Sequence, residues 1–343
     1  MARVILIFLF VALSFSPLDA GAWGIFSMLT TEKFDWLPTE CAHRKFPMTL
    51  IKGDLILKDG HSLYVPAKAI IDNGWGELGS THIVGETMKS LPVKLTATWF
   101  SYTENKFFSG DFELPYDSIL KLVRTMISSR TGKKPTAYWF LVGFGPEGAV
   151  SVWVAAEGIT EEVGNYKAKE VTLDWKVVLD NDDISRSDYI NEVLRDSLTS
   201  QQQKELKEHG VLQGISGYYS KQYKYNLSVG GQTKRELWLR TLNGEQEYFD
   251  FNHTSNVRTY RGLPQNITVY WENKTGLGIG AHIFFDEAEI NAAYKRLSAE
   301  TGDRPMELKL EISDNPWVIH NSLNDGKYII LLNKTEVKPY SLP

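Results

Sequence analysis

The sequence predicts an α+β protein built from two tandem, similar domains, each an antiparallel sheet with one helix packed on it. The first observation behind this prediction is a set of five residues that recurs at the same spacing in both halves of the 343-residue chain. The two sets are Leu91, Pro92, Leu95, Thr96, Trp99 and Leu263, Pro264, Ile267, Thr268, Trp271. Chance agreement between two alternating sequences is the other explanation, but a repeat this long indicates two copies of one domain rather than a solenoid, whose units run to roughly 20–50 residues.

The second observation is a Thr-Gly pair, with Pro three residues beyond the glycine, that follows each tryptophan of the repeat. The members are Thr131, Gly132, Pro135 and Thr301, Gly302, Pro305. Upstream, Phe46, Leu50, Gly53 match Tyr223, Leu227, Gly230, and each set leads into an alternating segment, residues 54–58 or 236–240. The shared order of these patterns favours a duplication.

The third observation is the order of secondary structure, in which strands precede one helix and more strands follow it. In copy one, alternation and turn residues predict strands at 62–65, 94–101, 106–114, 138–142 and 150–155. In copy two they predict strands at 236–241, 248–251, 267–271, 306–312 and 328–332, and one that ends at Phe285.

A helix is expected between the tryptophan and the Thr-Gly pair of each copy. Its apolar residues recur at three-and-four spacing, as Ile119, Leu122, Val123, Met126, Ile127 and as Ile290, Ala293, Tyr294, Leu297. Asp286 with Glu289 indicates a cap and its reciprocal partner, and Gly132 and Gly302 suit the stop beyond a helix.

The domain organisation predicted from these patterns is a signal peptide at 1–22, copy one at 23–170, a helical bridge at 171–216 and copy two at 217–343. Arg3, the apolar run at 4–15 and the small residues at 20–22 indicate the signal. An uncleaved anchor is the alternative, although the run is shorter than the ~20 residues that span a bilayer. Bridge helices are expected at 187–198 and 200–209, the latter with Ser200 as cap, Gln203 at the boxed position and Gly210 as stop.

Composition narrows the class of partner. A net charge of −5 and the absence of a clustered basic face argue against nucleic acid, and an acidic protein suits a basic protein partner. Cys41 is the single cysteine, so no intramolecular disulfide is possible, and a structural role is expected for it. No other stretch of the chain is long and apolar enough to span a membrane.

The loop at 66–90 is about twice as long as its counterpart at 252–262, and long loops in compact domains are often functional. It contains Asp72, Trp75, Glu77 and Glu86 among glycines, so these four residues are predicted to bind a protein partner, with Trp75 as the aromatic anchor. The alternative is that Trp75 folds back as a lid on a small core.

Sequence motifs assign no reaction. Gly74, Gly76, Gly79 and Gly143, Gly145, Gly148 have the glycine spacing of a dinucleotide site, but neither set lies between a parallel strand and a helix. The chain lacks a phosphate loop, a nucleophile elbow and histidines at metal-binding spacing. We therefore expect no cofactor, no metal ligand and no catalytic residue.

The segment from Leu91-Pro92 through Trp99, continued by Ser101, Glu104, Lys106, Phe107, Gly110, Phe112, Leu114 and Pro115, resembles the signature of domain of unknown function 2931. Copy two resembles it less, because it lacks the second Leu-Pro. Proteins of this family are often envelope lipoproteins of proteobacteria, and some resemble immunity proteins that neutralise phospholipase effectors of type VI secretion.

The resemblance implies a periplasmic, non-enzymatic immunity protein whose partner is a cognate toxin, with a phospholipase effector as the concrete expectation. This chain has no cysteine at the cleavage site, so a free periplasmic location is expected. Two alternatives stay open: an envelope enzyme that acts on glycan or lipid through carboxylates such as Glu86 or Asp111, and a carbohydrate- or lipid-binding module.

Overall fold

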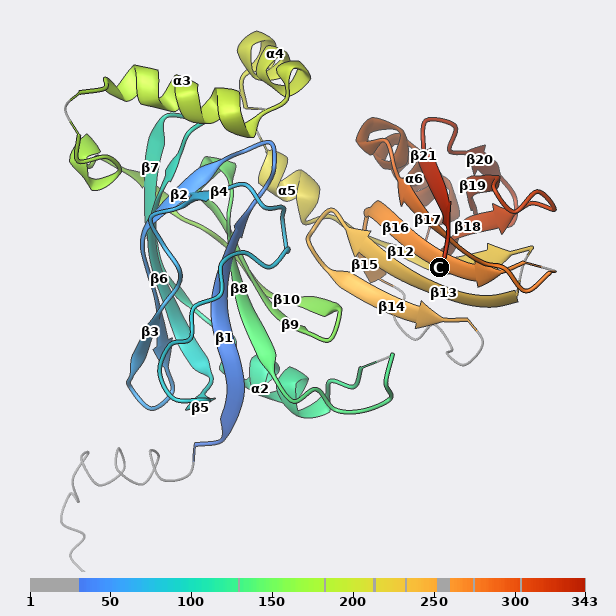
Figure 1. The fold of residues 1–343 in the computed structure, drawn as a ribbon, viewed down its shortest axis with the longest axis horizontal. Coiled ribbons are helices and arrows are strands. Elements are labelled where there is room, and N and C mark those ends of the chain that lie inside the picture. Colours follow the sequence, from blue (N-terminus) through green and yellow to red (C-terminus); the bar gives the residue numbers. More distant parts are fainter. Residues whose placement is uncertain are drawn as a thin grey trace, which may run out of the picture.

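The computed structural model describes residues 31–342 apart from 129, 182, 212–213, 232, 252–259, 274 and 303, so the predicted signal peptide at 1–22 lies outside the described residues. Strands dominate the fold and helices pack around them, which is compatible with the α+β class (Figure 1). In the described part of the chain, no helix has the length and apolar character needed to cross a membrane.

Among the described residues, the first half contains eleven strands: β1 (Lys33–Ala42), β2 (Met48–Leu57), β3 (Ser62–Tyr64), β4 (Ile70–Ile71), β5 (Met88–Ser90), β6 (Pro92–Ser101), β7 (Lys106–Glu113), β8 (Tyr138–Phe144), β9 (Ala149–Ala156), β10 (Ile159–Lys167) and β11 (Lys169–Val171). Its helical elements are α2 (Tyr116–Thr125), η1 (Pro146–Gly148) and η2 (Trp175–Val177).

Three helices connect the halves: α3 (Arg186–Ser197), α4 (Ser200–His209) and α5 (Ile215–Tyr219). The second half contains β12 (Gln222–Gly230), β13 (Thr233–Thr241), β14 (Gln246–Asp250), β15 (Tyr260–Gly262), β16 (Pro264–Glu272), β17 (Gly278–Phe284), α6 (Glu287–Thr301), β18 (Met306–Ile312), β19 (Ile319–Asn324), β20 (Ile329–Leu331) and β21 (Glu336–Ser341).

The strands of the first half belong to two sheets, in the orders β5-β1-β8-β9-β10 and β3-β2-β6-β7-β11. The second half pairs its strands in the same two orders, β15-β12-β18-β19-β20 and β14-β13-β16-β17-β21. The register agrees as well, since Leu55 pairs with Leu95 and Leu239 pairs with Ile267. The two halves therefore share one strand-pairing pattern.

The single antiparallel sheet predicted for each copy is wrong in two respects. Each half has two sheets, and β1 pairs with β8, as β12 pairs with β18, in parallel. The upstream alignment is also wrong, because Tyr223, Leu227 and Gly230 lie in β12, whose pairing position is that of β1, whereas Leu50 and Gly53 lie in β2.

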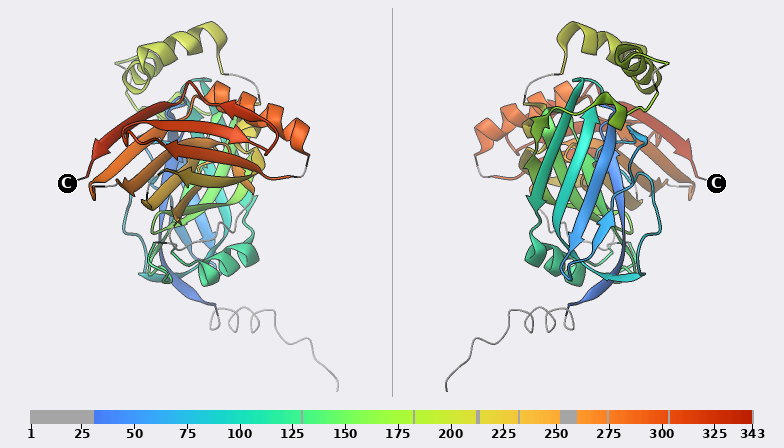
Figure 2. Two further views of the ribbon diagram at one scale, coloured as in Figure 1. Left: turned by 90° about the vertical axis from the view of Figure 1, so that its right-hand side faces the viewer. Right: turned by 90° about the vertical axis from the view of Figure 1, so that its left-hand side faces the viewer.

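One continuous ten-stranded sheet joins the halves, because the edge strand β10 of the first half meets the edge strand β14 of the second. A single residue pair, Thr160 with Gln246, forms this contact. Figure 2 shows the strands of each half from the two ends of the molecule, with α3 and α4 above them. We call the region where the two halves meet the seam. Besides the β10–β14 pair it includes the contacts of Gly76 with Gly244 and of Glu77 with Arg240, so side chains and loops contribute to it as well as the sheet.

The hydrophobic core lies between the sheets and continues through the seam as one cluster. In the first half Trp99 of β6 contacts Phe144 of β8, with 5.1 Å between ring centroids. In the second half Tyr294 of α6 lies against Tyr225 of β12, with a centroid distance of 5.0 Å. Since these rings are fully buried, they hold each half together by packing.

The helices differ in detail from the prediction. Helix α6 begins after its cap Asp286, which accepts from the backbone of Glu289, but the Glu289 carboxylate accepts instead from the backbone of Asn333 and Lys334. Helix α2 ends at Thr125, so Gly132 does not cap it, whereas α6 ends at Thr301 and Gly302 is its C-terminal cap as predicted.

The bridge helices lie over the first half as well as between the halves. Ile190 and Val193 of α3 are buried against Phe100 and Phe107, on the outer face of β6 and β7. The cap of α4 is Thr199 with Gln202 at the boxed position, one residue before the predicted pair, and Gly210 ends the helix as expected.

Candidate functional site

The four residues predicted to bind a partner lie on the loop between β3 and β6, but the structure separates them. Trp75 and Glu77 lie at the seam with the second half and Asp72 precedes them in the loop, whereas Glu86 pairs with Lys33 at a distance of 3.2 Å. Lys33 begins β1 and the loop near Trp75 packs beyond its end, so the length of that strand, about 30 Å, separates the two groups. They do not form one site.

Trp75 is buried, with 7% of its surface exposed, so the predicted exposed anchor is wrong and the lid interpretation describes its position. Its indole stacks on the imidazole of His43, with 4.7 Å between centroids and 8° between planes. It also meets the edge of Trp153 at 5.0 Å. Trp75 therefore pins the loop against β9 and the seam.

A close backbone contact requires glycine at position 76 of the loop. Gly76 has a positive φ of 72°, and a Cβ at this position would overlap the backbone carbonyl of Gly244 in the β13–β14 turn. The backbone N–H of Gly76 donates to the Sγ of Cys41 at 3.3 Å. Complete burial raises the pKa of the Cys41 thiol to about 12, so this cysteine stays a neutral thiol.

Charged groups hold the same part of the loop to both halves. The Glu77 carboxylate lies 3.0 Å from Arg44 in the first half and 4.0 Å from Arg240 in the second. Arg240 also donates to the carbonyl oxygen of Gly76 at 3.3 Å. Glu77 thus contributes to the seam, and its binding to a partner stays a prediction.

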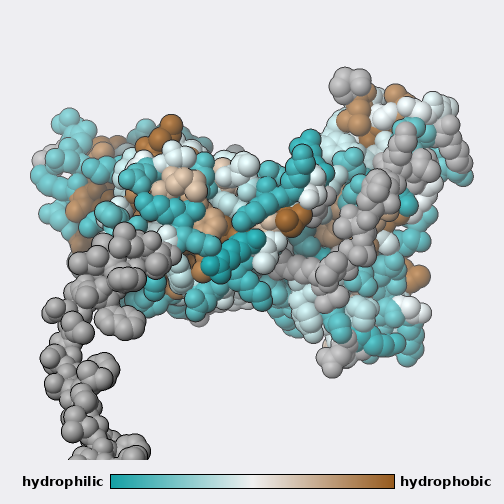
Figure 3. All heavy atoms as spheres, turned by 90° about the horizontal axis from the view of Figure 1, so that it is seen from below, coloured by the Kyte–Doolittle hydropathy of each residue, from teal (hydrophilic) through white to brown (hydrophobic). Residues whose placement is uncertain are grey.

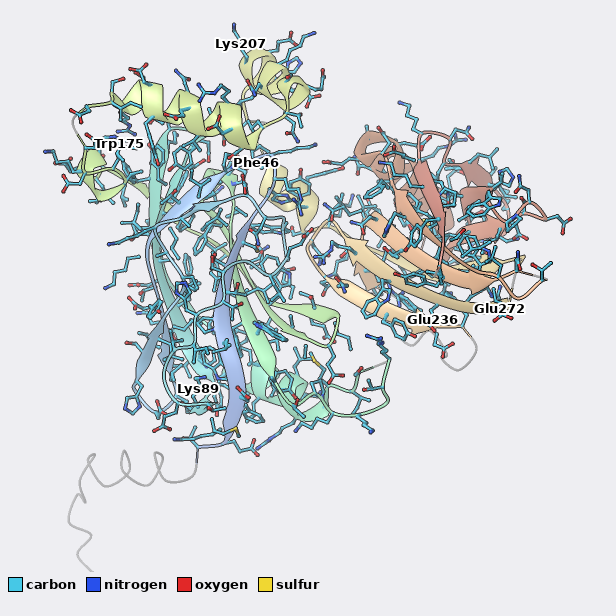
Figure 4. The ribbon with its side chains drawn as sticks, in the orientation of Figure 1. Phe46, Lys89, Trp175, Lys207, Glu236 and Glu272 are labelled. Atoms are coloured by element: carbon cyan, nitrogen blue, oxygen red, sulfur yellow. The ribbon has the colours of Figure 1, made fainter. Side chains whose placement is uncertain are left out.

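The protonation of His43, which lies at the seam, is strongly perturbed. It lies between Trp75 and Tyr219, whose ring centroid is 4.2 Å away, and Phe46 borders it beside α5 (Figure 4). Burial, with a smaller effect from Lys45, lowers the pKa of His43 to about 3. The imidazole is therefore neutral at physiological pH and is a poor general base.

A narrow cavity adjoins this stack and is lined by His43, Glu162, Asn165, Tyr219 and Asn243, among others. Its volume of about 10 Å³ is close to the minimum that holds one water molecule and far below the roughly 300–1,000 Å³ of small-molecule sites. Burial raises the pKa of Glu162, and the Glu245 carboxylate adds to that effect. This arrangement suits a buried water rather than a substrate.

The exposed apolar residues of the loop were missed by sequence reasoning. Ile83 is 92% exposed, and Leu78, Met88 and the neighbouring Tyr64 are about half exposed. The Tyr64 hydroxyl lies 3.3 Å from Nδ1 of His82, which places Tyr64 next to the Ile83 segment. The sequence signal that could have identified them is Ile83, a large aliphatic residue in a segment that also contains Ser80, Thr81, His82 and Gly85.

These exposed apolar residues differ from most of the surface that surrounds them. Seen from below, most of the described surface is hydrophilic and its apolar side chains form small patches (Figure 3). Exposed apolar side chains that gather in one segment make that segment a candidate interaction surface. Within the described chain, this loop contributes four of the exposed large hydrophobic residues: Ile70, Leu78, Ile83 and Met88.

The carboxylates suggested for an enzyme are each paired with a lysine. Glu86 pairs with Lys33, and Asp111 on β7 lies 3.7 Å from Lys94 on β6. Among the residues that the structure describes, no group of three His, Cys, Asp or Glu side chains is arranged to hold a metal ion.

Comparison with known proteins gives one match. The model of a family described as "Protein of unknown function (DUF2931)" matches residues 26–214, a range that contains the first half, the loop at 66–90 and helices α3 and α4. Neither the curated proteins nor the solved structures gave a match.

Proposed function

This chain belongs to the DUF2931 family of proteins of unknown function, and we propose that it is a non-enzymatic binding protein of the bacterial cell envelope that recognises another protein. In its most concrete form the proposal is an immunity protein that binds and blocks a secreted antibacterial effector, such as a type VI phospholipase. The family resemblance described above supports this choice of partner.

The observation that carries the proposal is the loop at 66–90, in which a pinned segment is followed by an exposed apolar one. Trp75 and Gly76 hold one part of the loop at the seam. Ile83 stands in solvent beside Tyr64 and His82. A fixed support lowers the entropy lost on binding, and exposed apolar side chains supply the desolvated centre that protein interfaces require.

The charge of the chain supports a cationic partner. The net charge is −5, and the exposed Glu86 lies three residues from Ile83 at the margin of the apolar segment. Acidic groups around an apolar centre speed the encounter with a basic surface and set the orientation of docking. The partner-contacting residues of this proposal are therefore Ile83 and Glu86, and any contact of the partner with Asp72 or Glu77 would be a separate one.

Two further parts of the proposal concern location and architecture. The positive, apolar and small-residue pattern at 1–22 supports export to the periplasm. The identical strand-pairing order of the two halves supports tandem copies of one domain, the first at 23–170 and the second at 217–343.

The experiment is a toxicity assay with the effector encoded by the gene adjacent to this one. Cells that direct the effector to the periplasm should die without this protein and survive with it. Ile83→Asp should weaken the purified complex about 30-fold or more, the cost of a central interface residue. Ile329→Asp is the matched control, because Ile329 is also exposed, at 72%, but lies on β20 of the second half.

Survival of cells that lack this protein would contradict the immunity function. An equal loss of affinity for Ile83→Asp and Ile329→Asp, or no loss for either, would remove the loop from the interface. Circular dichroism of both variants should match the unmodified protein, since neither residue is buried.

A further inference from the structure

A second candidate surface lies on the outer face of the sheet β14-β13-β16-β17-β21 in the second half. Side chains along these strands alternate, and Leu237, Leu239, Ile267 and Val269 point inward and are buried. The intervening residues point away from the core. They form rows of aromatic and polar side chains across the sheet.

The central row crosses the sheet by direct strand pairing. Trp238 is opposite Tyr248 on one side and Thr268 on the other, and Thr268 is opposite His282. The rings of Trp238 and Tyr248 lie 4.7 Å apart, and the Thr268 hydroxyl is 3.1 Å from Nδ1 of His282. The row is thus ordered by contacts among its own members.

Trp238 is also fixed from the first half. A Cβ on Gly158, in the β9–β10 turn, would overlap the six-membered ring of this indole, so the glycine lets the ring lie against the turn. The aromatic platform therefore stands at the seam, close to Gly76 and Glu77 of the loop, which Arg240 contacts.

A shallow hollow of about 270 Å³ lies on this face, a little below the roughly 300–1,000 Å³ range of small-molecule sites. Its lining includes Trp238, Arg240, Asn266, Thr268, Tyr270 and His282. Glu236 on β13 and Glu272 on β16, both labelled in Figure 4, are not among the residues that line this hollow.

The charge in the hollow favours a neutral ligand. Among the residues that line it, Arg240 is the one with a permanent charge, and its guanidinium is engaged by Glu77 and by the side-chain oxygen of Gln246. The other polar groups are an amide, a hydroxyl, a phenol and an imidazole, which donate and accept hydrogen bonds. A phosphate or carboxylate would meet no free cation here.

The first half provides the comparison that makes this face distinctive. Because the registers agree, Trp238 corresponds to Asp54, Tyr270 to Thr98 and His282 to Asp111. At these three positions the second half therefore carries Trp, Tyr and His where the first half carries Asp, Thr and Asp, whereas Tyr248 corresponds to another tyrosine, Tyr64. Packing of the sheet does not require Trp238 or Tyr270, since the first half folds with Asp54 and Thr98 at the corresponding positions.

We propose that this face of the second half binds a neutral saccharide chain, with Trp238 and Tyr270 stacking on the sugar rings. Pyranose rings present flat C–H faces that pack on aromatic rings, and their hydroxyls bond to amide, hydroxyl and imidazole groups such as those of Asn266, Thr268 and His282. The site goes beyond the protein-binding loop because it belongs to the other half of the chain.

The test is isothermal titration calorimetry of the purified full chain after export with three trisaccharide probes: the β-1,4-linked trimers of glucose and of N-acetylglucosamine, and α-linked maltotriose. At least one probe should bind at millimolar concentration. Trp238→Ala should weaken that binding roughly tenfold or more, and Asn266→Ala should weaken it several-fold.

Asp54→Ala is the matched control, since Asp54 occupies the same register position in the first half and should leave saccharide affinity unchanged. The thermal unfolding midpoint of each variant checks that the fold is retained, and Asn266→Ala serves if Trp238→Ala unfolds. The proposal is overturned if no probe binds the unmodified protein, or if folded Trp238→Ala and Asn266→Ala bind as well as Asp54→Ala.

Discussion

The imidazole of His43 lies parallel to the indole of Trp75 and is covered on its other side by the ring of Tyr219. His43 follows the end of β1, Trp75 belongs to the long loop, and Tyr219 ends α5. One stack of three rings thus fixes the loop, the first half and the start of the second half relative to each other.

The stack makes stability depend on pH. The pKa of His43 is about 3 in the folded chain and about 6.5 when unfolded, so the unfolded state binds the proton more readily. Its contribution is complete above pH 6.5 and is lost as the pH falls towards 3, at about 1.4 kcal/mol per pH unit. Urea unfolding of His43→Phe should show about 2 kcal/mol less loss between pH 7 and pH 5 than the unmodified protein.

Other groups titrate in the same range, so the comparison uses the difference between the two proteins. Burial raises the pKa of Glu40, which opposes the effect of His43 in both proteins alike. Lys45, the charge that lowers the pKa of His43, is unchanged in the variant. The same pH dependence in both proteins would show that His43 is accessible to protons in the fold.

Truncation of Trp75 should destabilise the protein strongly, whereas truncation of Ile83 should leave its stability almost unchanged. Trp75→Ala removes a buried indole between His43 and Trp153 and should lower the free energy of unfolding by about 3–5 kcal/mol. Ile83→Ala removes an exposed side chain and should change it by less than about 0.5 kcal/mol. Denaturant titration of both variants measures the difference, and equal effects would contradict the assigned positions.

Gly76→Ala should be more destabilising than Gly60→Ala. Both glycines have positive φ, so each substitution carries backbone strain of about 1–3 kcal/mol. A Cβ on Gly60 meets open space, whereas one on Gly76 overlaps the carbonyl of Gly244. Thermal unfolding of the two variants isolates the contact across the seam, and similar midpoints would mean that the turn moves away at little cost.

Arg261 should be sensitive because it is fully buried and holds Glu247 at 2.8 and 3.1 Å, along with the carbonyl of Tyr225. Arg261→Met leaves the carboxylate without this partner and should cost about 3–5 kcal/mol. Adding Glu247→Leu should restore part of the loss, because the unmatched charge is removed as well. Strictly additive effects in a double-mutant cycle would argue against the pairing.

Local sequence patterns predicted the parts of the fold that local contacts decide. The alternation through Trp99 and Trp271 predicted β6 and β16, and three-and-four spacing predicted α2 and α6. The predicted match of Leu95 to Ile267 also agrees with the strand register, since the two residues occupy equivalent pairing positions in β6 and β16. Residues Lys33–Ala42 escaped prediction as β1, because a strand covered on both faces lacks clear alternation.

The sequence offered an exposed and a folded-back position for Trp75 but could not decide between them, because the choice depends on partners that are distant in the chain. His43 precedes it, but Tyr219 and Gly244 belong to segments beyond the first half. The loop pattern identified a segment of unusual length and composition, and tertiary packing decided which of its side chains are exposed. The same holds for Trp238, whose outward orientation follows from the pairing of β13 with β16.

The contact between Gly76 and Gly244 sets an order for folding, because it needs both halves of the chain. A chain emerges from its N-terminus, and a first half can fold before the second is complete. The loop at 66–90 is made early, but the turn that receives Gly76 is made much later. The candidate binding loop therefore completes its contacts at Gly76 only when the turn of the second half is in place, which links the final shape of this segment to the folding of the second half.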